Sequence, residues 1–149
     1  MENKKLEFRI TDNKILNIAD FDWLIKDINA IYISKTNNAN WLYPELGIYI
    51  ETDFDTVELY YKTTDEIKIS NAYKSLVTAI SNVDQKFKMF FPVCLNLNNV
   101  KHITTKKMAV VGYKAILTFN EKEHEIVASK KRIEELICEY NQLQENLKL

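Results

Sequence analysis

Short runs of β-branched and aromatic residues are grouped around two longer amphipathic stretches, and this pattern most limits the fold that the chain can adopt. The runs at 28–34, 46–52 and 56–62 have the composition and the two-residue period of strands. Residues 70–83 and 129–149 instead place apolar side chains along one side at helical spacing. Many strands with few helices predict an α+β protein that is mainly β.

Weaker patterns predict the remaining elements. They are strands at 4–10, 90–97, 99–105 and 125–129, a short helix at 19–28 and a polar loop at 36–45. The helix at 19–28 is favoured because four apolar residues recur at helical spacing, namely Phe21, Leu24, Ile25 and Ile28. Ser70 or Asn71 is expected to cap the helix at 70–83, and Pro92 indicates an edge strand or a bulge.

Length and composition narrow the class of protein. A chain of 149 residues is long enough for one domain with a sizeable core. With only two glycines, no phosphate-binding glycine loop can be built. No apolar run reaches the length of a membrane span, and the N-terminus lacks a signal peptide, so we expect a cytoplasmic protein without a membrane partner. Cys94 and Cys138 are expected to be reduced thiols.

No catalytic or metal site is predicted. The only histidines, His102 and His124, do not fit a metal-ligand spacing. Asp53 and Asp55 resemble a solvated hairpin turn more than a pair of catalytic acids. We therefore expect a protein that binds rather than catalyses, without a cofactor.

The positive charge is concentrated in one part of the chain. From Lys86 to Arg132 there are ten lysines and arginines against three glutamates, although the whole chain carries a net charge of −1. This asymmetry favours an anionic partner for the basic part.

The start of the last predicted helix carries the most informative charges. Lys130, Lys131 and Arg132 follow Ser129 directly, where they face the positive end of the helix dipole. Helix N-termini present free N–H groups to anions, so this turn is suited to phosphate. The alternative interpretation is an incidental cluster of exposed lysines.

Several motifs, in order, resemble the LytTR family of bacterial DNA-binding domains. The segment "FKMFFPVCLNLNNVKHI" (87–103) follows that family's phrase, in which Leu95-Asn96-Leu97 falls on a Val-Asn-Leu motif. The segment "NEKEHEIVASKKRIEEL" (120–136) is similar to members of the accessory-gene-regulator type. The helix "YKSLVTAI" (73–80) and the strand "DINAIYI" (27–33) match earlier elements of the family.

The resemblance implies an elongated β-sandwich with a C-terminal helix, in which loops contact DNA. It implies one LytTR-like unit at 28–149, preceded by an N-terminal strand and helix extension at 1–27. The residues that it places at DNA, together with the neighbouring basic residues, are Lys88, Asn96, Lys106, Lys107, Lys130, Lys131 and Arg132. The expected function is that of a bacterial transcription regulator acting on duplex DNA.

The sequence departs from the family at Phe90, Phe91 and Pro92, where the family has a polar contact segment. These side chains cannot form hydrogen bonds with bases or phosphates. DNA binding with low sequence specificity is one outcome, and the alternative is an adaptor or inhibitor that uses these residues as a protein-partner surface. The apolar side of residues 133–147 predicts either a helix packed on its own core or a homodimer seam.

Overall fold

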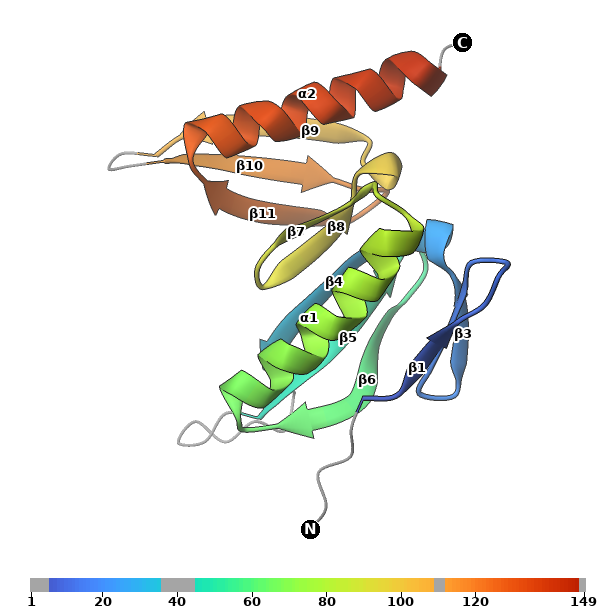
Figure 1. Cartoon of the computed structure of the whole chain (residues 1–149). Coiled ribbons are helices and arrows are strands. Elements are labelled where there is room, and N and C mark those ends of the chain that lie inside the picture. The colour runs from blue at the N-terminus through green and yellow to red at the C-terminus, as the bar shows by residue number, and fades with distance from the viewer. Residues whose placement is uncertain (1–5, 36–44, 109–111, 148–149) are drawn as a thin grey trace. The chain divides into compact units, whose positions relative to one another are not determined.

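The computed structural model describes residues 6–35, 45–108 and 112–147, and the expected α+β class is confirmed (Figure 1). The chain divides into two compact units, the N-terminal unit (Met1–Asn96) and the C-terminal unit (Leu97–Leu149). In chain order the elements are β1 (Phe8–Ile10), β2 (Ile15–Ile18), β3 (Phe21–Leu24), the 3₁₀ turn η1 (Ile25–Asp27), β4 (Ile28–Lys35), β5 (Leu46–Thr52), β6 (Thr56–Thr63), α1 (Glu66–Val83), β7 (Phe87–Phe90), β8 (Val93–Asn96), the 3₁₀ turn η2 (Leu97–Asn99), β9 (His102–Lys107), β10 (Tyr113–Thr118), β11 (Glu123–Ala128) and α2 (Lys130–Leu147).

The N-terminal unit is built on a five-stranded antiparallel sheet in the order β6-β5-β4-β8-β7. Helix α1 lies along this sheet (Figure 1). It buries a stripe of apolar side chains in the same core as Ile31, Ile48 and Ile50 of the central strands. Burial of one such large side chain stabilises the fold by roughly 1.5–3 kcal/mol.

Helix α1 begins four residues earlier than the sequence indicated. Asp65, not Ser70 or Asn71, is the N-cap, and its carboxylate accepts hydrogen bonds from the N–H groups of Ile67 and Lys68 at 3.0 and 3.1 Å. A carboxylate at this place satisfies two of the free N–H groups of the first turn and complements the helix dipole.

The prediction of a short helix at 19–28 is wrong. Its residues form strand β3 and the turn η1, and β3 pairs with β2 through a two-residue hairpin. Ala19 and Asp20 occupy this hairpin with φ of 49° and 65°, the left-handed values that a tight type I′ turn requires. The hairpin reverses the chain before Phe21, so the alternation of a strand prevails over the helical spacing.

The expected division at residue 27 does not match the division in the structure. Strand β2 contributes Leu16 and Ile18 to the same core cluster as Ile31 and Tyr73. Residues 1–27 are therefore part of the N-terminal unit where the structure describes them, and the boundary between units falls between Asn96 and Leu97.

The C-terminal unit consists of a three-stranded antiparallel sheet, in the order β11-β10-β9, and the helix α2 (Figure 1). One face of the sheet contributes buried apolar side chains, and α2 buries Ile133 and Leu136. Farther along α2, the Tyr140 hydroxyl donates a 3.0 Å hydrogen bond to the Val100 carbonyl. The prediction of a terminal helix is confirmed.

The strands predicted at 28–34, 46–52 and 56–62 are confirmed as β4, β5 and β6. The run at 90–97 is divided between two strands: β7 ends at Phe90, and Phe91 and Pro92 form the turn that leads into β8. The polar loop expected at 36–45 lies, except for Glu45, outside the described residues.

Candidate nucleic-acid interface

The register of the three-stranded sheet brings basic residues from separate parts of the sequence to one end of the C-terminal unit. Lys107, the last residue of β9, is opposite Tyr113, the first residue of β10. Tyr113 is in turn opposite Ala128, two residues before α2 begins at Lys130. We call the set Lys106, Lys107, Lys130, Lys131 and Arg132 the basic end, and all five residues are exposed.

Gly112 holds the backbone of this end in place. Its φ of 98° is strained for other residues, and a Cβ atom there would lie 3.2 Å from the carbonyl oxygen of Ala128. The Gly112 carbonyl also accepts a hydrogen bond from the Met108 N–H at 3.3 Å. A glycine at this position therefore permits the close approach of the residue before β10 to the last residue of β11.

The cations of β9 face both sides of the sheet. Because successive side chains in a strand alternate, Lys107 shares the face of Tyr113 and Lys106 shares the opposite face with Lys114. The ammonium group of Lys130 lies 5.9 Å from the centre of the Tyr113 ring, on the first of these faces. Lys114 forms a 2.9 Å salt bridge with Glu125, which leaves its charge compensated.

The first turn of α2 contains no acidic residue. The Ser129 hydroxyl accepts a 3.3 Å hydrogen bond from the Arg132 N–H, and the Lys130 ammonium comes no closer than 3.9 Å to the Glu134 carboxylate. Each cation at the positive end of the helix dipole costs about 0.3–1 kcal/mol. The three cations of this turn therefore destabilise the helix, and the turn suits the binding of an anion.

The two units also differ in net charge, and the C-terminal unit is the positive one. The C-terminal unit contains nine lysines and arginines against seven glutamates, and the N-terminal unit contains eleven against fourteen acidic residues. A positive unit attracts a polyanion over a distance set by the salt concentration.

Two of the residues predicted at DNA are not part of the basic end. Lys88 lies half-buried on β7 in the N-terminal unit. Asn96 is completely buried, and its amide Nδ2 donates hydrogen bonds to the carbonyls of Ile28 at 2.9 Å and Lys26 at 3.4 Å. A side chain without exposed surface cannot reach a base or a phosphate, so the assignment of Asn96 to DNA is corrected to a structural role.

The predicted partner surface is exposed in part. Phe91 is 51% exposed and Pro92 is exposed, whereas Phe90 is half-buried in β7. The Phe91 ring packs edge-on against Tyr73, with the ring centres 5.9 Å apart, and the Lys74 ammonium lies 5.4 Å from its centre. Phe91 is thus held in a defined position at the surface.

The homodimer seam, which was one of two interpretations of residues 133–147, would lack its first two apolar residues. Ile133 and Leu136 are 2% and 3% exposed within the single chain, so their apolar surface is already used in the core of the C-terminal unit. Of the two interpretations, packing on the unit's own core accounts for these residues.

Tyr113 is a residue of the site that the sequence did not indicate. It follows Gly112 in the chain, and only the strand register places its ring beside Lys107 and Lys130. A glycine followed by an aromatic at the start of a strand was the one available signal.

Two other features, a metal site and a membrane span, were searched for in the described ranges. No three His, Cys, Asp or Glu side chains come together there as a metal site requires. No helix in the part of the chain that the structure describes is long and apolar enough to span a membrane. The chain matches no protein-family model, no curated protein and no solved structure, so the resemblance to the LytTR family stays a hypothesis.

Proposed function

We propose that the chain binds duplex DNA through the basic end and acts as a transcription regulator of LytTR-like type, with the elongated β-sandwich that this family implies. The observation that carries the proposal is the convergence of five exposed cations, from β9 and from the first turn of α2, in one unit. Neutralisation of phosphates by such cations releases counterions and supplies most of the affinity of non-specific DNA binding.

The directions of the cations favour an extended polyanion over a single phosphate. Lys106 and Lys107 face opposite sides of β9, and Lys130 faces the side of Lys107. One small anion cannot contact both sides of a strand at once, whereas phosphates spaced along a duplex can. The half-buried ring of Tyr113 lies between the cations from β9 and α2.

Sequence readout is expected to be weak. Phe91 and Pro92 offer no hydrogen-bonding side-chain group, and the amide of Asn96 is occupied by carbonyls inside the N-terminal unit. Phosphate contacts position a protein on DNA without reading its sequence. The proposal is therefore of binding with little discrimination between duplexes.

Fluorescence anisotropy with a 25-base-pair labelled duplex, at 50 and 200 mM salt, tests the proposal. Five phosphate contacts give a slope of about −4.5 in log K against log salt, so Kd should rise about 500-fold over this range. Absence of binding at 50 mM salt would refute DNA binding, and the adaptor hypothesis at Phe91 and Pro92 would then take its place.

Charge reversal locates the interface. Lys107→Glu and Lys131→Glu should each weaken binding and reduce the slope by about one. A glutamate at position 131 is favoured by the helix dipole, so unfolding cannot explain a loss of binding in that variant. Lys101→Glu is the matched control, because Lys101 is exposed in the same unit but lies about 20 Å from Lys107 along β9. Equal losses in all three variants would contradict the location.

A further inference from the structure

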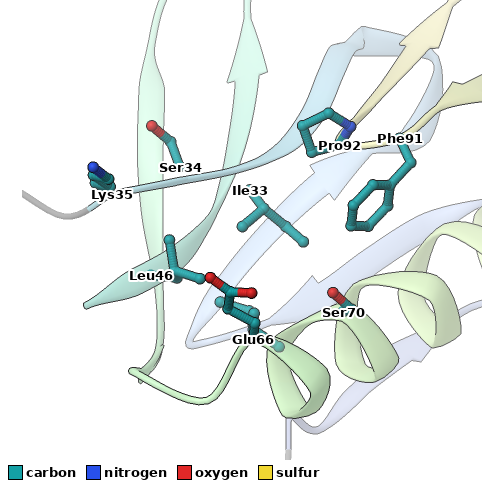
Figure 2. Close-up of a pocket in the computed structure, with 9 residues that line it drawn as sticks. Ile33, Ser34, Lys35, Leu46, Glu66, Ser70, Phe91 and Pro92 are labelled. Atoms are coloured by element: carbon teal, nitrogen blue, oxygen red, sulfur yellow. The ribbon is translucent and has the colours of Figure 1, made fainter. Parts of the chain in front are cut away.

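A groove in the N-terminal unit lies between the end of β4, the start of α1 and the turn at Pro92. It has a volume of about 490 Å³, within the usual range for small-molecule sites. Its lining residues are Ile33, Ser34, Lys35, Leu46, Glu66, Ile69, Ser70, Phe91 and Pro92. Figure 2 shows Ile33 and the ring of Phe91 directed toward this space.

The walls of the groove are fixed by contacts of their own. The Ile33 N–H donates a 3.1 Å hydrogen bond to the Pro92 carbonyl, which ties β4 to the turn. The Tyr49 hydroxyl donates to the Lys35 carbonyl at 3.2 Å and holds the end of β4. Asp65 caps α1 directly before Glu66. A groove whose walls are held before binding costs a ligand little ordering.

The chemistry of the lining indicates an amphipathic occupant. The body of the groove is apolar, with Ile69 at 1% exposure and the Phe91 ring left half-exposed beside it. Covering such a ring is favourable in proportion to the apolar area removed from water.

The polar residues of the groove carry opposite charges. Lys35 comes from β4 and Glu66 from the first turn of α1, and a serine neighbours each of them in the lining. A carboxylate ligand would be attracted by Lys35 and repelled by Glu66, and an ammonium ligand the reverse, so neither charge gains a clear net attraction. A neutral group that both accepts and donates hydrogen bonds satisfies both.

We propose that this groove binds a neutral amphipathic small molecule, with an alkyl or aryl body against Ile33, Ile69 and Phe91 and an amide-like polar end between Lys35 and Glu66. The occupant is small because the groove is bounded by β4, α1 and the Pro92 turn. No part of this proposal depends on DNA binding.

A series of straight-chain N-methylamides, from butanamide to decanamide, tests the proposal by ligand-detected NMR titration of the full chain. Affinity should increase about fourfold for each added methylene and level off when the groove is full. The carboxylate and the amine of equal chain length should bind at least tenfold more weakly than the amide. Tighter binding of either charged compound, or no saturable binding of any amide, would overturn the proposal.

Substitutions in the groove, with one control outside it, locate the binding site of the amides. Ser70→Trp fills the groove from α1 and should weaken amide binding at least tenfold, whereas Ser75→Trp, at an exposed position of the same helix, should leave it unchanged. Equal binding to both variants would place the amides elsewhere and overturn the assignment. Phe91→Ala removes one wall at a half-exposed position and should also weaken binding, so the test survives if Ser70→Trp fails to fold.

Discussion

Replacing Asn96 by Asp separates a structural role of this residue from a role in DNA contact. The side chain is completely buried, and its amide donates to two backbone carbonyls, of Ile28 at 2.9 Å and of Lys26 at 3.4 Å. Aspartate has nearly the same shape, but its ionised carboxylate has no hydrogen to donate. Both carbonyl oxygens would then face a negative charge.

The magnitude follows from these contacts. Removal of the donor takes the shorter hydrogen bond from a buried carbonyl oxygen, which costs about 1–3 kcal/mol in all. Burial of the new carboxylate costs more unless it takes up a proton. We expect the free energy of unfolding to fall by at least about 3 kcal/mol at pH 7 for Asn96→Asp.

The loss should depend on pH with a defined sign. Burial and the two carbonyls raise the pKa of the new carboxyl in the folded state above its value in the unfolded chain. The folded state then binds the proton more tightly, so the variant regains stability relative to the wild type as the pH falls. A protonated carboxyl can also donate to one of the two carbonyls.

Urea denaturation at pH 7 and pH 5, followed by tryptophan fluorescence, measures the effect. Trp23 lies in β3 of the N-terminal unit, which also contains Asn96. With a slope of about 2 kcal/mol per molar urea, a loss of 3 kcal/mol lowers the midpoint by about 1.5 M. Asn71→Asp, at an exposed position of α1, is the control. A difference below about 0.5 kcal/mol between the two variants, together with weaker DNA binding by Asn96→Asp, would restore Asn96 as a contact residue.

Three further predictions concern single features. Burial raises the pKa of the Cys94 thiol to about 12, so at pH 8 a disulfide reagent should rapidly modify only the exposed Cys138, and modification of both thiols in the native protein would contradict this burial. Ala19→Asn with Asp20→Gly suits the left-handed φ values of the β2–β3 hairpin and should raise the free energy of unfolding by about 1 kcal/mol in urea; a lower value would argue against this turn. Tyr140→Phe removes the 3.0 Å hydrogen bond of its hydroxyl and should destabilise α2 by about 1 kcal/mol, seen as faster amide exchange in the helix, and unchanged exchange would show that the bond is dispensable.

The local elements were predictable because their signals are local. Strand β4 and helix α2 show their periods within the segment itself. The segment 19–28 was not predictable in this way, because Phe21, Leu24 and Ile25 fit a helical spacing. The deciding feature, a hairpin at Ala19 and Asp20, lacks the Asn-Gly pair that usually marks such a turn.

The candidate site was predictable only as a list of cations. The sequence indicated Lys107 and Lys130, but their convergence on Tyr113 depends on the pairing of β9 with β10, which no local pattern reveals. The burial of Asn96 was hidden for the same reason. Its partners are the carbonyls of Lys26 and Ile28, about seventy positions earlier in the chain.

The position of β9 at the edge of its sheet gives its lysines a second consequence. An edge strand presents unpaired backbone groups to which another chain can add, and lysine side chains on the edge prevent such addition. Lys106 and Lys107 therefore protect the protein from aggregation as long as they keep their charge. Replacement of both by apolar residues should then lower solubility, whereas glutamates at the same two positions should preserve solubility and weaken only the proposed binding to DNA.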